Sequence, residues 1–408
     1  MRYNPVVETI KNRPWVLYIL ILPIVAWSVV YYLLPQFSDV KTQDPEHPSD
    51  FLMYLTGATI VREGKISNLY DYETQRSYQR SISGTTPTEL ITGVLAFRTP
   101  PTTAWLYSLL PVQDSVKSFW IVVFINSVCI VTAIYLLSGS LIKTCVYSTA
   151  VTFFLSFWMT LIGGHPNGLL LLIMVLAYTA LKNKRPGVAG IITGFLFLKP
   201  TFLLLVPFMF LLTKDKKQLF SYAGFFLLTI LFLIGVNTAI FGPRFVQTYI
   251  PYLINSENSS YGTDISNNTN LTAVMYTVQK WLGSAHSTWI PIGVVVALNI
   301  FSLLAIYKKR LIFSPAHGFG LICLLLPLLN LHTMHADLLV HLIPLILIVG
   351  TLVKNKRWLL AVILAIVLII LPWYSLADLE WLVTLVILGL SFLLLNNLKW
   401  LGNQKTRA

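Results

Sequence analysis

The chain has 408 residues, of which 56% are hydrophobic and only 11% are charged. An ordinary soluble protein is about 45–50% apolar and about 25% charged, so this chain has too few charges to cover a water-soluble globule. The high apolar content also excludes a disordered chain, because disorder goes with low hydrophobicity. The net charge of +13 is compatible with a nucleic-acid partner, but the positions of the basic residues argue for a membrane protein instead.

Apolar runs of the length that crosses a bilayer follow one another along the chain. A membrane span needs about 20 apolar residues. Twelve candidate spans lie near residues 15–35, 115–138, 144–162, 168–181, 187–198, 201–213, 219–242, 288–307, 314–331, 338–353, 358–373 and 382–396. No small-residue cleavage site follows the first run, so we expect it to remain as a helix and not to act as a signal peptide. The predicted fold class is all-α, a polytopic membrane protein with a single integral membrane domain over residues 1–408.

The connections between these runs alternate in character. Four are short and basic, namely 182–185, 214–217, 308–310 and 354–357, whereas segments 36–102 and 243–287 are long and mixed in charge. With both termini in the cytoplasm, that side holds 19 of the 29 basic residues and two acidic ones. This distribution follows the positive-inside rule. The basic excess therefore indicates membrane insertion, with 36–102 and 243–287 as extracytoplasmic loops and no nucleic-acid partner.

Residues 187–213 are predicted to form two short helices that meet at Lys199-Pro200. One continuous helix would place the basic clusters 182–185 and 214–217 on opposite sides of the membrane, against the charge rule. Each short helix would be about 18–20 Å long, less than the ~30 Å hydrocarbon core, so the turn would lie at membrane depth. A lysine there is a candidate functional residue. The alternative is a structural lysine paired with an acid or a helix end.

Segment 36–102 predicts two helices outside the membrane. Apolar residues recur at helical spacing from Asp50 onward, and Gly64 supplies a stop signal. A second, polar helix is expected after Tyr70-Asp71, and a short apolar stretch at 102–111 reads as interfacial or re-entrant. Asp50 has two interpretations: an N-cap of the first helix, or a general base at the membrane surface.

Two further polar clusters lie at predicted outer ends of spans. His165 and Asn167 belong to a tight turn, where they either serve the turn or bind sugar hydroxyls. His332 and His335 lie one helical turn apart beside Asp337, and we interpret them as polar lining of an outer cavity. No HExxH motif or cysteine cluster supports metal binding, and the sequence has no nucleotide, redox or serine-hydrolase motif. We therefore expect neither a cofactor nor a metal.

The order of these elements resembles glycosyltransferase family 87. The resemblance rests on Asp50-Phe51-x-x-Tyr54, Gly64, Leu69-Tyr70-Asp71, Pro100-Pro101, Leu110-Pro111, Gly164-x-x-Asn167, Gly190 with Lys199-Pro200, Asn270-Leu271 and His335, and it covers about residues 15–350. The chain departs from the family pattern at Thr99, His165 and Met334, where an aromatic residue, Gln and Trp are usual. These departures bear on the identity of the sugar more than on the class of reaction.

The resemblance implies a GT-C-like fold and the transfer of one sugar, foremost mannose, from a polyprenyl-phosphate-linked donor to a lipid or glycan acceptor. It implies an inverting reaction in which Asp50 is the catalytic base and Lys199 neutralises the leaving phosphate. The residues expected to bind substrate are Lys199, Asp71, His165, Asn167, His332, His335, Arg98 and Tyr54. Asp50 and Lys199 should then reach one cavity on the extracytoplasmic side of a bacterial plasma membrane.

Two other functions stay open at this stage. Short helices that meet inside the membrane are also typical of secondary transporters, which would place a binding site at Lys199-Pro200. An envelope polysaccharide polymerase or ligase would be expected to carry catalytic arginines and histidines in a late outer loop. The only basic or imidazole side chains in segment 243–287 are Arg244, Lys280 and His286. The polymerase or ligase is therefore the weaker alternative.

Overall fold

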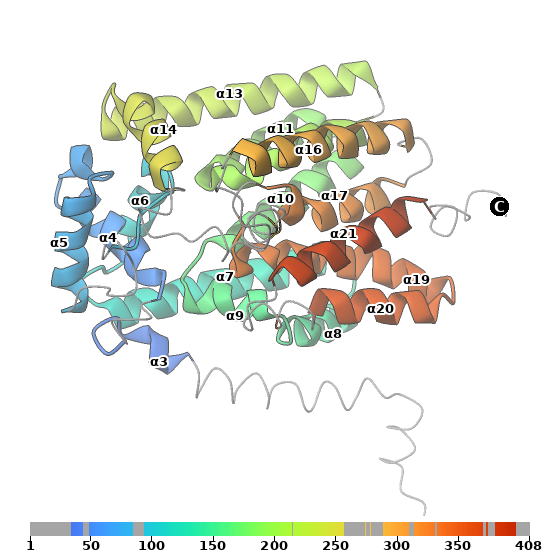
Figure 1. Ribbon diagram of the computed structural model, residues 1–408, viewed down its shortest axis with the longest axis horizontal. Helices are drawn as coiled ribbons and strands as arrows, with labels where there is room; N and C mark the ends of the chain where they lie inside the picture. The colour runs from blue at the N-terminus through green and yellow to red at the C-terminus, as the bar shows by residue number, and fades with distance from the viewer. Residues whose placement is uncertain are drawn as a thin grey trace, which may run out of the picture.

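The computed structural model describes residues 34–43, 49–84, 94–213, 215–256, 274, 278, 289–309, 314–330, 333–369, 373 and 380–396. Within these ranges every regular element is a helix. Residues 34–108, as far as they are described, are named the first outer segment after the extracytoplasmic position predicted for 36–102. They form α3 (Pro35–Ser38), α4 (Phe51–Arg62), η1 (Ile66–Asn68), α5 (Tyr72–Ser83) and α6 (Pro101–Ser108). With α14 (Phe245–Ser256), the helices α4, α5 and α6 form one end of the molecule (Figure 1).

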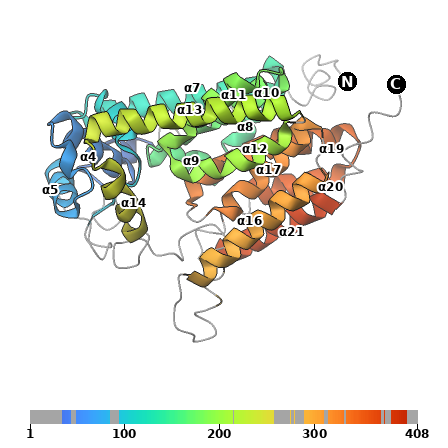
Figure 2. The same cartoon turned by 90° about the horizontal axis from the view of Figure 1, so that it is seen from above.

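The rest of the described chain forms a helical bundle beside this end. Its first half comprises α7 (Ser115–Ser138), α8 (Leu141–Val151), α9 (Leu155–Ile162), α10 (Asn167–Lys182), α11 (Pro186–Gly194), η2 (Phe195–Leu198), η3 (Pro200–Leu204), α12 (Leu205–Leu212) and α13 (Lys216–Phe241). Its second half comprises α16 (Trp289–Lys309), α17 (Pro315–Leu329), η6 (His335–His341), α18 (Leu342–Pro344), the π-helix η7 (Leu345–Val349), α19 (Gly350–Lys354), α20 (Trp358–Ile369) and α21 (Glu380–Asn396). In Figure 2 the first-half helices α7, α10, α11 and α13 run side by side, and α16, α20 and α21 lie on the other side of the bundle.

The expected spans from 115–138 onward coincide with helices wherever the chain is described, whereas 15–35 falls almost wholly outside the described residues. Among the described residues, three helices are long and apolar enough to cross a membrane: Ser115–Ser138, Lys216–Phe241 and His335–Lys354. A fourth span results if α8 and α9, bent by 79° at their junction, count as one. The expected twelve spans are therefore not shown. Further apolar helices of the described chain, such as Asn167–Lys182 and Trp358–Ile369, are 10–17 residues long, shorter than the ~20 residues a span requires.

The outward faces of the bundle helices are apolar. Leu231 and Phe232 on α13 are 57% and 63% exposed, and Phe124 on α7 and Leu359 on α20 are exposed still more. Large apolar surfaces of this kind mark contact with an apolar environment. Together with the long apolar helices, they indicate a membrane protein.

Glycines allow α11 to lie against α13 at short range. A Cβ at Gly190 would stand 2.3 Å from the carbonyl oxygen of Tyr222, and one at Gly194 would stand 2.5 Å from the Thr229 side chain. Small residues at helical spacing let two helix backbones approach closely in this way. The contact fixes α11, which leads directly into the break at Lys199.

The predicted break at Lys199-Pro200 is confirmed. Lys199 has an extended backbone (φ −139°, ψ 94°) between η2 and η3. The break frees the carbonyl of Leu198, which accepts a hydrogen bond from Thr103 Oγ1 at 2.8 Å. A freed backbone group in an apolar region needs such a partner. Thr103 lies on α6, so the break also joins the outer segment to the bundle.

Both helices predicted for the first outer segment are present. α4 begins directly after Asp50, and the chain turns at Gly64, whose φ of 73° lies in the left-handed region. The polar helix α5 follows Asp71 and buries Gln75 and Gln79. The apolar stretch predicted at 102–111 contains α6, which ends at Ser108; its interfacial or re-entrant character stays a prediction.

The buried glutamines of α5 hold the extended segment that precedes α6. Gln79 Nε2 donates to the Leu95 carbonyl at 2.7 Å, and Gln79 Oε1 accepts from the Leu95 amide at 2.9 Å. Gln75 Oε1 accepts from the Phe97 amide at 3.0 Å. The two side chains thus replace the partner strand that an extended backbone otherwise needs.

Two apolar cores meet between the outer segment and the bundle. Phe51 and Leu161 belong to the outer core, whereas Leu170 and Leu198 belong to the bundle core. The turn between α9 and α10, the break at Lys199 and the start of η6 therefore come together at this boundary. The candidate site described next occupies it.

Candidate active site

Asp50 stands directly before α4 but does not cap it. Ser49 takes that role, because its Oγ accepts a hydrogen bond from the Phe51 amide at 3.1 Å and donates to the Ile162 carbonyl at 2.8 Å. The Asp50 side chain makes no capping hydrogen bond. Its Oδ2 lies 3.0 Å from His165 Nε2, and the side chain is 37% exposed. The carboxylate is thus directed to His165 and solvent rather than to the helix terminus.

His165 has a partner at each ring nitrogen. Its Nδ1 lies 3.1 Å from the hydroxyl of Tyr54, while Nε2 faces the Asp50 carboxylate. The Tyr54 ring stacks on Tyr107 with centroids 4.7 Å apart, and the Tyr107 hydroxyl donates to the Gly164 carbonyl at 2.5 Å. A carboxylate only accepts, so Nε2–H donates to Asp50, and a neutral ring then accepts from Tyr54 at Nδ1. This chain of contacts joins α4, α6 and the turn before α10.

The turn that carries His165 depends on Gly164. Its φ of 57° lies in the left-handed region, and a Cβ there would stand 2.4 Å from the Phe51 ring. Only glycine meets both conditions without strain. The close contact with Phe51 sets the turn directly against the start of α4, next to Asp50.

Lys199 and Asp337 form a buried ion pair, with side chains 11% and 4% exposed. Lys199 Nζ donates to Asp337 Oδ1 and, at 3.3 Å, to Asn167 Oδ1. Asn167 Nδ2 donates to the same Asp337 oxygen at 3.0 Å, and the Met334 amide donates to Asp337 Oδ2 at 3.2 Å. Of the alternatives open for Lys199, pairing with an acid is therefore realised. The sequence interpretation had grouped Asp337 with the two histidines and did not link it to Lys199. The signal for this pair was that a buried lysine requires a counter-charge.

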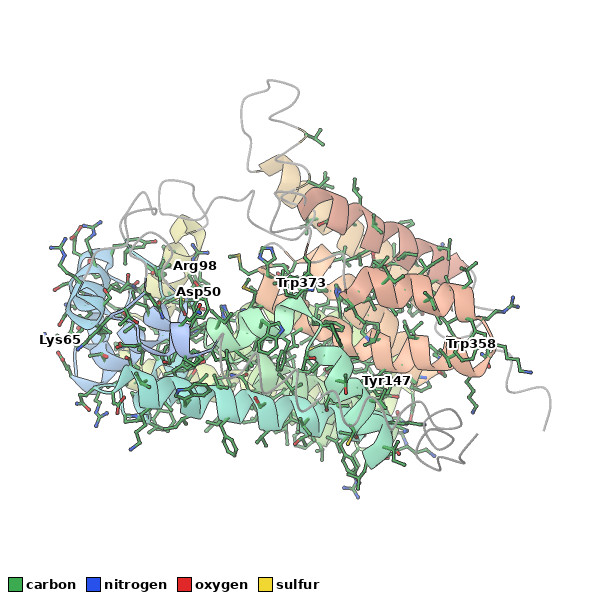
Figure 3. The ribbon with its side chains drawn as sticks, turned by 90° about the horizontal axis from the view of Figure 1, so that it is seen from below. Asp50, Lys65, Arg98, Tyr147, Trp358 and Trp373 are labelled. Atoms are coloured by element: carbon green, nitrogen blue, oxygen red, sulfur yellow. The ribbon has the colours of Figure 1, made fainter. Side chains whose placement is uncertain are left out.

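The Asp50 carboxylate lies within the electrostatic reach of two cationic side chains, Lys199 and Arg98. Burial by itself raises the pKa of the Asp50 carboxyl, whereas the hydrogen bond from His165 lowers it. The charges of Lys199 and Arg98 add to this lowering, and the net result is a pKa below the usual value of 3.8. Figure 3 shows Asp50 and Arg98 in the same region, away from Trp358 at the other end of the bundle. Asp50 is therefore ionised at neutral pH and faces two positive charges.

The backbone at Arg98 is held by two tyrosines. The Tyr249 hydroxyl of α14 donates to the Arg98 carbonyl, and the Tyr70 hydroxyl donates to the Thr99 carbonyl, each at 2.9 Å. Tyr70 and Tyr249 also lie against each other with ring centroids 5.1 Å apart. The position of Arg98 thus depends on α14 as well as on the first outer segment.

The other predicted site residues have these positions. Asp71 is the N-cap of α5, where its Oδ2 accepts from the amide and hydroxyl of Thr74 at 2.8 and 2.6 Å. His335 opens η6 two residues before Asp337, and its buried Nε2 has no hydrogen-bond partner among the described residues. His332 lies outside the described residues. Substrate binding by these residues stays a prediction. Within the described ranges, no three His, Cys, Asp or Glu side chains come together as a metal site.

The structure thus brings Asp50, Tyr54, His165, Asn167 and Lys199 into one connected region, with Arg98 in electrostatic reach. Sequence reasoning did not identify Tyr107 and Asp337 as parts of this region. Each of them contacts a residue more than 50 positions away in the chain: Tyr107 hydrogen-bonds to Gly164, and Asp337 pairs with Lys199. No local pattern signals a contact of that kind.

Comparison with protein families gives one match, to glycosyltransferase family 87 over residues 97–331. No curated protein matches the chain. The matched region contains Arg98, His165, Asn167 and Lys199, whereas Asp50 and Asp337 lie outside it. This match supports a glycosyltransferase and not a secondary transporter. Because it covers more than half of the 408 residues, the chain belongs to glycosyltransferase family 87, a family of membrane proteins with the GT-C fold.

Proposed function

We propose that this glycosyltransferase moves a single sugar, foremost mannose, from a polyprenyl-phosphate-linked donor to a lipid or glycan acceptor, with inversion at the anomeric carbon. Asp50 is the general base. The observation that carries the proposal is the Asp50 carboxylate, which is free of the helix cap, ionised and bonded at one oxygen to His165. A base must present an unprotonated oxygen within hydrogen-bond reach of the acceptor hydroxyl.

In the proposed step the acceptor oxygen attacks the anomeric carbon as its proton passes to the Asp50 carboxylate. The bond between that carbon and the phosphate oxygen breaks, and the phosphate leaves with the electron pair. Positive groups placed where charge develops stabilise such a transition state. Lys199 and Arg98 lie near enough to Asp50 to influence its ionisation, which supports assigning them to the phosphate.

Apart from His165, the remaining site residues are assigned to the sugar and the acceptor in this proposal. Asn167 lies between the turn and the ion pair, and Tyr54 lies beside His165 on the first helix turn of α4. His335 offers a buried nitrogen that no described protein group occupies. Asp71 and His332 are the remaining residues that the sequence analysis expects to bind substrate, and the proposal includes them. The polyprenyl chain of the donor lies between helices of the bundle, and no metal is required for the chemistry.

We further propose about twelve spans, with both termini in the cytoplasm and the site on the extracytoplasmic side of a bacterial plasma membrane. Two basic connections support this orientation. α13 begins with Lys216 and Lys217, and α19 ends at Lys354, which precedes Lys356 and Arg357. Both ends lie away from α4 and α5 (Figure 1). These two basic connections and the candidate site are thus at opposite ends of the bundle, as the positive-inside rule expects.

The test is mass spectrometry of envelope glycolipids from host cells with the wild-type protein, with no protein and with Asp50→Asn. We expect one glycolipid to lose a single sugar in both the null and the Asp50→Asn strain, and the mass difference names the sugar class. In isolated membranes, turnover of Asp50→Asn should fall by about 10²–10⁴, as for a lost general base.

Asp114→Asn is the matched control, because Asp114 caps α7 through the Lys117 amide at 2.9 Å and asparagine caps as well as aspartate. This variant should keep the glycolipid profile of the wild type. A normal profile in Asp50→Asn cells with the protein present in the membrane would remove Asp50 from the chemistry. An unchanged profile in the null strain would contradict the proposed transfer itself.

A further inference from the structure

The sequence interpretation assigned His165 to the sugar, but its contacts suggest a different task. Both ring nitrogens are already engaged, Nε2 with Asp50 at 3.0 Å and Nδ1 with Tyr54 at 3.1 Å. The side chain is 8% exposed. A histidine with both nitrogens occupied has no site left for a sugar hydroxyl, nor for the proton of the acceptor. The oxygen of Asp50 that His165 does not hold is the group that remains available.

We infer that His165 is a positioning residue for Asp50: it fixes one carboxylate oxygen so that the other faces the acceptor hydroxyl, and Tyr54 fixes its tautomer. This inference rests on the proposed function, since it requires Asp50 to be the base. For a neutral imidazole the hydrogen bonds have one consistent direction. The Tyr54 hydroxyl donates to Nδ1, so the proton of the neutral ring is on Nε2, and Nε2–H donates to Asp50 Oδ2.

Tyr54 is itself rigidly placed, which makes it suitable for this task. Its ring stacks on Tyr107 and meets Phe97 edge to face, with ring centroids 4.7 and 6.3 Å apart. Tyr54 is 1% exposed and Tyr107 is 8% exposed. Tyr107 in turn donates to the carbonyl of Gly164, the residue before His165. The ring of His165 is therefore held both by its own hydrogen bonds and by the backbone of its turn.

Two conservative replacements of His165 distinguish the roles of its two ring nitrogens. The amide nitrogen of glutamine reaches the place of Nε2, and that of asparagine reaches the place of Nδ1. His165→Gln therefore keeps a donor to Asp50, whereas His165→Asn keeps a polar group near Tyr54 and loses the donor. His165→Ala removes both contacts. A misplaced catalytic group costs roughly 100-fold in rate, so we expect kcat to fall about that much in His165→Ala and His165→Asn and much less in His165→Gln. KM should change little in all three.

The rates are measured in membranes of the null strain that express each variant. The donor is radiolabelled polyprenyl-phosphate mannose, or the lipid-linked sugar that the glycolipid mass difference identifies. The acceptor is the lipid extract of the null strain, in which the unmodified glycolipid accumulates. The amount of each variant in the membrane is determined by immunoblot, so that a loss of folded protein is not mistaken for a loss of kcat.

The dependence of kcat/KM on pH gives a second measurement. The groups that face Asp50 are His165 from the turn before α10, Lys199 from the break between η2 and η3, and Arg98 from the segment before α6. Asp337 faces Lys199, and the Tyr54 hydroxyl faces His165. Removing the donor at Nε2 removes one influence that lowers the pKa of Asp50, while burial continues to raise it. The acid limb of the profile should therefore move to higher pH in His165→Ala and stay close to the wild-type position in His165→Gln.

A double-mutant test distinguishes this inference from the proposed function. If His165 acts through Asp50 alone, adding His165→Ala to Asp50→Asn should slow transfer no further. If Asp50→Asn is inactive but His165→Ala keeps the wild-type kcat, the base assignment stands and the positioning role is wrong. A rise in KM without loss of kcat, equal in His165→Gln and His165→Asn, would make His165 a sugar contact. If Asp50→Asn itself transfers normally, the proposed function fails together with the inference.

Discussion

The buried pair of Lys199 and Asp337 gives a stability prediction whose size follows from the structure. Asp337→Asn removes the charge that balances Lys199, whose side chain is 11% exposed. Breaking a buried ion pair from one side costs about 3–5 kcal/mol, or roughly 10²–10⁴-fold in the ratio of folded to unfolded protein. Lys199→Met should cost less, because the Asp337 carboxylate keeps hydrogen bonds from Asn167 and the Met334 amide.

The double variant Lys199→Met/Asp337→Asn removes both charges and should recover most of this loss, since replacing both members of a buried pair is often nearly neutral. Membrane proteins commonly unfold irreversibly, so the measured quantity is the half-life of the monodisperse protein in detergent at a fixed elevated temperature. We expect the order wild type, double variant, Lys199→Met, Asp337→Asn, from longest to shortest half-life. Single variants as stable as the wild type, or a double variant no better than Asp337→Asn, would refute the argument.

The double variant also tests the role proposed for Lys199 in the reaction. It should fold, yet it lacks the positive charge assigned to the leaving phosphate. We therefore expect the purified variant to be stable but slow in sugar transfer. Full transfer activity in the stable double variant would show that Lys199 is purely structural.

Three further predictions follow from the packing and electrostatics. Gly190→Ala forces α11 away from the Tyr222 carbonyl and should cost about 1–3 kcal/mol, whereas Gly224→Ala, which meets nothing within 4 Å on α13, should be neutral or stabilising in the same thermal assay; equal effects would contradict the close helix contact. Gln79→Met leaves both backbone groups of Leu95 unpaired and should cost about 1–3 kcal/mol for each; unchanged protease resistance between α5 and α6 would argue against this. Because the pKa of Asp50 lies below 3.8, its carboxylate stays ionised until the pH falls below that value. The enzyme should therefore lose activity through protonation of Asp50 only below pH 3.8. A wild-type acid limb between about pH 5 and pH 7 would therefore conflict with Asp50 as the controlling base.

The helix positions could be predicted because their signals are local. The expected run at 115–138 coincides with α7, and Asp50 and Gly64 flank α4 as the spacing of apolar residues indicated. The break at Lys199-Pro200 followed from proline chemistry together with the charge of the flanking connections. The expected number of spans is not shown, since hydropathy marks an apolar segment but not whether its helix is straight and long enough to cross a bilayer. The 79° bend between α8 and α9 is an example.

In the candidate site, too, local features could be predicted from the sequence and long-range contacts could not. The sequence by itself determined an all-helical membrane chain, a carboxylate at the start of the first outer helix and a lysine at a helix break, because these depend on composition and on neighbouring residues. The tertiary structure decided what each of these groups faces. Lys199 and Asp337 are 138 residues apart, and Tyr54 and His165 are 111 apart, yet each pair is in direct contact. Such pairs form because the outer and bundle cores pack against each other at the Gly164 turn, and packing between distant segments leaves no periodic trace in the sequence.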